Sequence, residues 1–233
     1  MKLHYFITPF SVAEETVAVA DTKVIHHIKD VLKIDVGEKI MLADGAGNKV
    51  LIRLSKLGKD FLEGQLLEHE ADLPLAPAVT LYAAMLKRDM FELVVQKAVE
   101  LGITKIVPLI TERTVKLGFN RERLERIIIE AVEQSEQSIV PMLGEPLSLS
   151  GAFAGTAESS CYFFQQEGSK IAEVILSDKK PIALFIGPEG GFAPEEVGLA
   201  KAQGATLVSL GPTMLRAETA AIATVFWARN LLK

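Results

Sequence analysis

A glycine-rich segment is the part of this 233-residue chain best suited to bind a ligand. It has the sequence Ile186-Gly187-Pro188-Glu189-Gly190-Gly191-Phe192 and is followed by Pro194. The apolar run Ile182 to Ile186 predicts a strand that ends at this turn, and Pro194 suits the first position of a helix. Glycines let backbone amides and carbonyls approach a ligand closely. A plain turn between a strand and a helix needs fewer glycines, so the segment favours a ligand site at a strand's carboxyl end.

A second turn also joins a predicted strand to a predicted helix. It follows the predicted strand Thr206 to Leu210 and precedes a predicted helix, Ala217 to Leu232. Backbone groups around an apolar slot can recognise a planar heterocycle. The side chains that could form such a slot here are Leu210, Met214 and Leu215.

Arg216 is the basic residue of this second turn, and Lys201 and Arg229 are its nearest basic neighbours in the sequence. A salt bridge to Glu218 or a helix cap is the plain interpretation. An arginine at a glycine-rich strand end also suits the stabilisation of an anion.

Several common sites are excluded or disfavoured by the sequence. It contains no G-x-G-x-x-G, no P-loop and no G-x-S-x-G elbow. A single cysteine, Cys161, excludes internal disulfides and a cysteine-based zinc site. The adjacent pair His26-His27 cannot present both rings on one face, so we expect no metal.

The charge balance excludes a protein held to nucleic acid by bulk positive charge. Lysine and arginine number 25 and aspartate and glutamate 30, for a net charge of −5. A local basic strip remains compatible with that total, and Lys87, Arg88 and Arg113 follow predicted strand ends. The apolar stretch Ala78 to Leu86 is far shorter than the ~20 residues that span a bilayer, so we expect a cytoplasmic protein with no membrane partner.

A change of pattern divides the chain at Leu73-Pro74-Leu75-Ala76-Pro77. Residues 1–73 are mostly strand-like, and we expect a small β-barrel with one short helix near Ile25 to Leu32. Residues 74–233 alternate strands and helices, which predicts an α/β domain with a mostly parallel sheet covered on both faces. The strands expected in residues 1–73 are Glu38 to Leu42, Lys49 to Leu54 and Phe61 to Leu67. Those expected later are Val79 to Met85, Ile106 to Ile110, Cys161 to Phe164, Ile182 to Ile186 and Thr206 to Leu210.

Taken together, these segments resemble the SPOUT superfamily of S-adenosylmethionine-dependent RNA methyltransferases. More narrowly, the chain resembles the bacterial family that methylates N3 of a uridine in 16S ribosomal RNA. The pair IGPEGG and LGP-x-x-LRAET is highly specific, and the weaker patches run in family order over nearly the whole length. Those patches are His27 to Lys33, Gln96 to Ile103, Thr111 to Arg113, Glu130 to Ser135 and Val140-Pro141.

The resemblance implies a fold and a cofactor. The fold would be an N-terminal PUA-like β-barrel for RNA binding (1–73) and a C-terminal SPOUT α/β domain tied in a trefoil knot (74–233). S-adenosyl-L-methionine would bind in the knot loops. The cofactor-binding residues implied are Ile186, Gly187, Pro188, Gly190, Gly191, Leu210, Gly211, Met214, Leu215, Ala217 and Thr219.

The resemblance also implies partners. The substrate would be 16S ribosomal RNA within the small ribosomal subunit, and the enzyme would be a homodimer. Candidate phosphate contacts are Lys33, Lys87, Arg88 and Arg113. Thr213 stands where the family often has a second arginine.

A mechanism follows if the target is uracil N3. The N3–H group is a weak acid, and the negative charge that develops when it loses its proton spreads onto O2 and O4. We expect Arg216 to stabilise that charge and either Glu189 or Glu218 to accept the proton. Two other functions stay open at this point: a non-catalytic RNA-binding and dimerisation protein, and a small-molecule enzyme that uses a nucleotide at the strand ends.

Overall fold

The computed structural model describes residues 3–87, 89–114, 118–174 and 180–230. They form two compact units. The first consists of Met1–Pro74 and Val132–Val140, and the second of Leu75–Ala131 and Pro141–Lys233. Nothing in the sequence indicates that Val132–Val140 belongs with the first unit, and this differs from the expected division after residue 73.

A six-stranded sheet forms the first unit, in the order β1-β4-β5-β6-β3-β2. Its strands pair antiparallel except for β1 and β4, which are parallel. The three expected strands are confirmed, and three more lie before them. The bounds are β1 His4–Ile7, β2 Ser11–Ala13, β3 Thr16–Val19, β4 Lys39–Ala43, β5 Asn48–Leu57 and β6 Leu62–Ala71.

The helix expected near Ile25 begins earlier and changes its type. α1 spans Thr22–His26, and the π-helical turn η1 spans His27–Val31. Asp21 caps α1, because its carboxylate accepts hydrogen bonds from the backbone of Lys23 and Val24. Ile25 and Ile28 are buried and pack into the core of the sheet.

The segment Val132–Val140 is held to the first unit by specific hydrogen bonds. The hydroxyl of Ser138 donates to Oδ2 of Asp72 at 2.5 Å, and the hydroxyl of Tyr5 donates to the carbonyl of Gln137 at 3.0 Å. The bond from Ser138, followed by Lys49, lowers the pKa of Asp72. Burial raises the pKa of Tyr5 to about 12.

The second unit contains a parallel sheet in the order β10-β8-β7-β12-β11-β13, with β9 also paired to β8. All five expected strands are present. The bounds are β7 Val79–Ala84, β8 Lys105–Ile110, β9 Met142–Leu143, β10 Leu147–Ser148, β11 Ser160–Lys170, β12 Ile182–Ile186 and β13 Thr206–Ser209.

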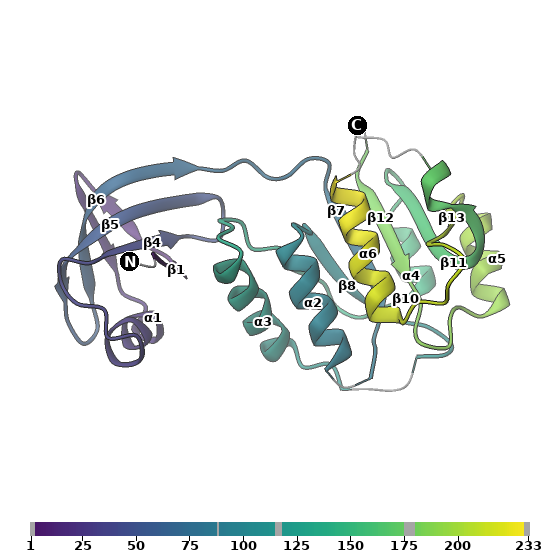
Figure 1. Ribbon diagram of the computed structural model, residues 1–233, viewed down its shortest axis with the longest axis horizontal. Coiled ribbons are helices and arrows are strands. Elements are labelled where there is room, and N and C mark those ends of the chain that lie inside the picture. The colour runs from purple at the N-terminus through teal and green to yellow at the C-terminus, as the bar shows by residue number, and fades with distance from the viewer. Residues whose placement is uncertain (1–2, 88, 115–117, 175–179, 231–233) are drawn as a thin grey trace. The chain divides into compact units, whose positions relative to one another are not determined.

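Helices cover both faces of this sheet, as expected (Figure 1). Alternate residues of β11 point to opposite faces. Tyr162 and Phe164 contact Trp227 of α6, whereas Phe163 packs with Phe153 of α4 on the other face. α2 contacts α6, and Ala200 of α5 joins the core on the α4 face. The bounds are α2 Met90–Glu100, α3 Arg121–Gln134, α4 Leu149–Ala154, α5 Pro194–Ala202 and α6 Ala217–Asn230.

The strand order brings the two glycine turns together. β12 lies between β7 and β11, and Ile186, its last residue, pairs with Ala83 and Phe164. Phe164 in turn pairs with Val208 of β13. The turns after β12 and β13 therefore leave the same edge of the sheet, where ligands bind in open parallel sheets.

Candidate functional site

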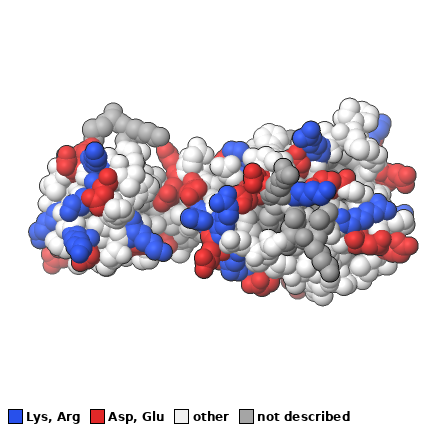
Figure 2. All heavy atoms as spheres, turned by 90° about the horizontal axis from the view of Figure 1, so that it is seen from below, with Lys and Arg blue, Asp and Glu red and all other residues white. Residues whose placement is uncertain are grey.

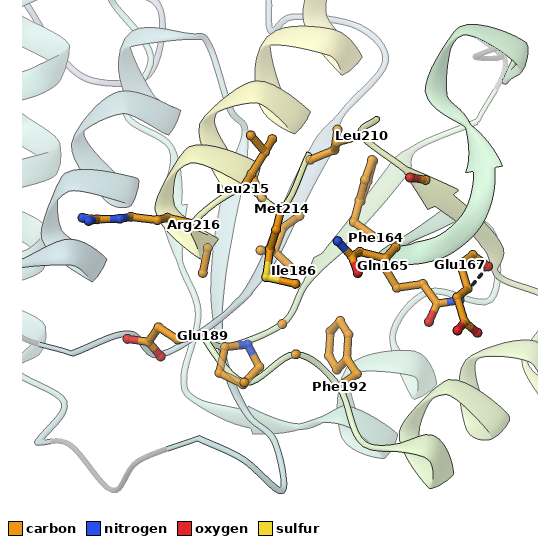
Figure 3. Close-up of a pocket in the computed structure, with 18 of the residues that line it drawn as sticks. Phe164, Gln165, Glu167, Ile186, Glu189, Phe192, Leu210, Met214, Leu215 and Arg216 are labelled. Carbon is orange, nitrogen blue, oxygen red and sulfur yellow. Dashed lines mark hydrogen bonds between the residues drawn. The ribbon is translucent and has the colours of Figure 1, made fainter. Parts of the chain in front are cut away.

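A cavity of about 1220 Å³ lies at this edge and is lined by both glycine turns (Figure 3). Residues of the start of α6, of α5 and of the middle of β11 also line it, together with Met90 and Arg113. All but one of the residues expected at the catalytic and cofactor sites line it: Ile186, Gly187, Pro188, Glu189, Gly190, Gly191, Leu210, Gly211, Met214, Leu215, Arg216, Ala217 and Glu218. The exception is Thr219, an exposed residue at the next position of α6.

The turn after β12 has a conformation that favours glycine. Gly191 has a φ of +68°, and its N–H donates to the carbonyl of Pro188 at 2.8 Å. A Cβ on Gly191 would meet no atom within 4 Å, so it would project into open space. A Cβ on Gly187 would lie 3.0 Å from the ring of Phe192, so that position is tightly packed. The backbone of this turn is thus closed on one side and open on the other.

The turn after β13 is also built on a glycine with positive φ. Gly211 has a φ of +136°, and a Cβ there would again meet no atom within 4 Å. The apolar side chains of Met214 and Leu215 follow; Met214 is 81% exposed. A large apolar side chain left exposed beside a cavity is typical of a surface that a ligand covers.

Sequence reasoning missed one wall of the cavity. β11 extends to Lys170, and both Phe164 and Ser169 pair with Val208, so the intervening residues bulge from the ladder. The close packing of Gly168 accompanies this bulge, since a Cβ there would lie 2.6 Å from the backbone of Val208. The only signal in the sequence is this glycine after a polar run. The lining residues that the bulged strand contributes are Phe164, Gln165, Gln166 and Glu167.

The charged side chains of the cavity differ in their exposure. Arg216 is 85% exposed along its side chain, whereas Glu218, in the first turn of α6, is 11% exposed. Glu189 is exposed, and its carboxylate accepts a hydrogen bond from the backbone N–H of Lys87 at 3.2 Å. Figure 3 shows Arg216 and Glu189 toward one side of the cavity and Glu167 toward the other. The charges that could act on a reacting base are therefore gathered at one end.

The residues expected to contact RNA lie in different parts of the structure. Lys33 belongs to the first unit, is exposed and has a φ of +54°. Lys87 is exposed after β7, and Arg113 lines the cavity and donates to the carbonyl of Gly190 at 2.8 Å. Arg88 lies outside the described residues. Figure 2 shows basic and acidic side chains interspersed over the face in view, so phosphate contact there depends on individual residues.

Metal-ligating clusters and membrane spans are both absent from the described ranges. Within residues 3–87, 89–114, 118–174 and 180–230, no group of three or more histidine, cysteine, aspartate or glutamate side chains is placed to hold a metal ion. No helix in that part of the chain is long and apolar enough to cross a membrane.

Comparison with known families defines the class of protein. The profile of the RNA methyltransferase domain matches residues 73–229, and that of the RNA methyltransferase PUA domain matches residues 20–67. The α/β unit with a cavity at its strand ends is thus an RNA methyltransferase domain. Individual relatives are more specific. The ribosomal RNA small subunit methyltransferase E of Rickettsia conorii is 32% identical over 211 residues, which cover 89% of this chain and 86% of the relative.

A second relative has the same name. The ribosomal RNA small subunit methyltransferase E of Synechocystis sp. is 35% identical over 232 residues, which cover 94% of this chain and 75% of the relative. This chain belongs to the ribosomal RNA small subunit methyltransferase E family.

A solved structure agrees over the full length. The Neisseria gonorrhoeae ribosomal RNA small subunit methyltransferase E bound to S-adenosyl methionine has a TM-score of 0.89 and 29% identity. The alignment covers 99% of this chain and 98% of that one. The non-catalytic alternative is not favoured by this similarity.

Proposed function

We propose that the chain transfers a methyl group from S-adenosylmethionine to N3 of a uridine in 16S ribosomal RNA. The observation that carries this proposal is the cavity between the two glycine turns, with Arg216 at one end, in a chain similar throughout to a relative bound to the same cofactor. Nucleoside mass spectrometry of 16S ribosomal RNA from cells lacking the protein tests it. We expect one 3-methyluridine to disappear and to return when the gene is restored.

The residues of the cavity fit the proposed cofactor. The Cβ positions of Gly191 and Gly211 are open, so a ligand can approach the backbone of both turns. Leu210, Leu215 and Ile186 provide apolar surface for a planar base. The volume of about 1220 Å³ exceeds the roughly 300–1,000 Å³ typical of small-molecule pockets, which leaves room for a nucleobase beside the cofactor.

S-adenosylmethionine would supply an electrophilic methyl group on its sulfonium. The two turns would hold the donor in line with N3, because alignment of the reacting atoms lowers the barrier substantially. Arg216 would stabilise the negative charge that develops on O2 and O4 of the uracil. Removing a hydrogen-bond donor of this kind costs on the order of 3 kcal/mol, or roughly a hundredfold in rate.

The acceptor of the N3 proton is one of two carboxylates. Glu218 is buried at the start of α6 and Glu189 is exposed in the glycine turn, and both line the cavity. Glu218 is the better candidate, because its carboxylate lies 3.9 Å from the guanidinium of Arg216, so the two groups can act on the same base.

The finer architecture and the partners are part of the same proposal. The turns after β12 and β13 are proposed to form a trefoil knot, as the resemblance to the SPOUT superfamily implies. Residues 1–73 would bind RNA and residues 74–233 would catalyse, in a homodimer that acts on the small ribosomal subunit in the cytoplasm. We propose that Lys33 and Lys87 contact RNA phosphates.

A further inference from the structure

Two loops far apart in the sequence hold each other by reciprocal hydrogen bonds. One loop, residues 111–114, follows β8, and the other is the glycine turn 187–193. Nη1 of Arg113 donates to the carbonyl of Gly190 at 2.8 Å. In the opposite direction, Oε1 of Glu196, in the first turn of α5, accepts the backbone N–H of Glu112 at 3.0 Å. Each side of the junction thus gives one charged side chain to the backbone of the other.

Glu196 has a second role at the same time. Its other carboxylate oxygen, Oε2, accepts the backbone N–H of Ala193 at 2.8 Å and so closes the first turn of α5. The carboxylate therefore joins the end of the glycine turn to the backbone of Glu112. Hydrogen bonds to charged groups are stronger than those between neutral groups, so we expect these bonds to restrain the junction.

The contacts bracket Gly191, one of the three glycines of the turn. Gly191 lies between Gly190 and Ala193, has a φ of +68° and has no atom within 4 Å of its Cβ position. Glycine loses more backbone freedom on ordering than any other residue. A ligand that bound a loose turn would have to order it, which weakens affinity, whereas a turn already held in place binds without that cost.

We propose that Arg113 and Glu196 are positioning residues that hold the 187–193 turn in its cofactor-binding conformation, and that Arg113 serves this purpose instead of contacting RNA phosphate. The inference rests on the proposed function, because it takes the cofactor to be S-adenosylmethionine.

Titration calorimetry with S-adenosylmethionine in the absence of RNA tests the proposal. Arg113→Met keeps an unbranched apolar side chain in place of the aliphatic part of the arginine but removes all its donors, and Arg113→Lys keeps a single charged donor group. Arg53→Met is the matched control, since Nη1 of Arg53 also donates to a glycine carbonyl, that of Gly37, at 3.2 Å in the first unit. We expect Kd to rise at least about tenfold in Arg113→Met, to rise less in Arg113→Lys and to stay unchanged in Arg53→Met.

Two further readouts separate positioning from a general loss of structure. Amide hydrogen exchange in residues 186–193 should accelerate in Arg113→Met while the melting temperature stays near that of the wild type. Glu196→Gln keeps one acceptor oxygen and loses the other, so it should also weaken cofactor binding and accelerate exchange in the same peptide. The salt dependence of RNA binding should not change in Arg113→Met.

Three outcomes would overturn the proposal. The first is wild-type cofactor affinity in Arg113→Met with a reduced salt slope for RNA, which would make Arg113 a phosphate contact. The second is a fall in melting temperature without any change in cofactor affinity or local exchange. The third is a loss of affinity in Arg53→Met equal to that in Arg113→Met. Failure of the wild-type protein to bind S-adenosylmethionine at all would instead contradict the proposed function.

Discussion

Nη1 of Arg216 lies 3.9 Å from Oε1 of Glu218, although the arginine side chain is 85% exposed and the glutamate side chain 11% exposed. At this distance the carboxylate attracts the guanidinium without accepting a hydrogen bond from it. The five N–H donors of the arginine thus stay available to a substrate. A buried carboxylate that orients an exposed guanidinium is suited to present those donors to an anion that forms only during the reaction.

Arg216→Ala should separate cofactor binding from catalysis. We expect S-adenosylmethionine to bind with nearly wild-type affinity and methyl transfer to fall about a hundredfold or more, because the donor acts on charge that develops in the transition state. Calorimetry and a methylation assay on 30S subunits measure the two effects. Arg216→Lys, which keeps the charge without the planar fork, should have an intermediate rate. Equal losses of binding and transfer in Arg216→Ala would show that the arginine belongs to the cofactor site.

Substitutions in the glycine turns should abolish cofactor binding, which Arg216→Ala leaves nearly intact. Gly191→Val and Gly211→Val place a β-branched residue at a φ of +68° or +136°, a conformation that costs on the order of 1–3 kcal/mol, and add a side chain in open space at two positions that line the cavity. Calorimetry should detect no cofactor binding, while circular dichroism shows a folded protein. Gly198→Ala is the control, because Gly198 lies inside α5 with no atom within 4 Å of its Cβ position. That change should stabilise the protein by up to about 1 kcal/mol and leave binding intact.

RNA binding can be tested by its response to salt. Lys33→Glu and Lys87→Glu should weaken binding to 16S ribosomal RNA and reduce the slope of log affinity against log salt by about one for each phosphate that is no longer neutralised. Lys59→Glu makes the same charge change at an exposed position between β5 and β6 and should have a smaller effect. Equal slopes in all three variants would mean that net charge alone accounts for the change.

Local patterns in the sequence were enough to predict the longer strands of both sheets. The strands that were missed are short. β1, β2 and β3 have three or four residues each, and β9 and β10 have two, so none shows a clear period. The first helix begins three residues before the expected Ile25 because its start is set by the side chain of Asp21. The association of Val132–Val140 with the first unit depends on bonds such as Ser138 to Asp72, which are 66 residues apart and leave no local pattern.

In the candidate site, too, local features could be predicted from the sequence and long-range contacts could not. The glycine turns could be predicted because positive φ is a local requirement that glycine meets. Gln165 and Glu167 could not, because a shift of register between β11 and β13 brings them to the cavity. Arg113 was predicted as a basic residue near RNA, but its hydrogen bond to Gly190, 77 residues away, is a property of the folded chain.

The hydrogen bond from Ser138 to Asp72 should make the stability of the protein depend on pH. The pKa of Asp72 is lowered in the folded state, so its contribution to stability is fully present above its unfolded pKa, near about 4, and is lost as the pH falls through the lower folded value. Ser138→Ala should therefore destabilise the protein at pH 7 by about 1 kcal/mol or less, since Asp72 is 43% exposed. Urea unfolding should show this difference shrinking below about pH 4. The control is Ser11→Ala, at an exposed serine of β2. A difference from wild type that stayed constant down to the acid limit would rule out Asp72 as its source.

Glutamine substitutions distinguish the two carboxylates proposed to accept the N3 proton. Glu189→Gln keeps an oxygen that can accept the N–H of Lys87, so the turn should keep its shape, and we expect most of kcat to remain. Glu218→Gln removes a buried charge beside Arg216 and should lower kcat by about 10²–10⁴-fold with little change in cofactor affinity.

The pH profile shows whether Glu218 takes the proton or only orients Arg216. Without a carboxylate acceptor the proton must leave to hydroxide, so the rate of Glu218→Gln should keep rising with pH, whereas the wild-type rate levels off. If Glu218 only oriented the arginine, kcat would fall by a constant factor at every pH, and Glu189→Gln would be the variant whose rate rises with pH.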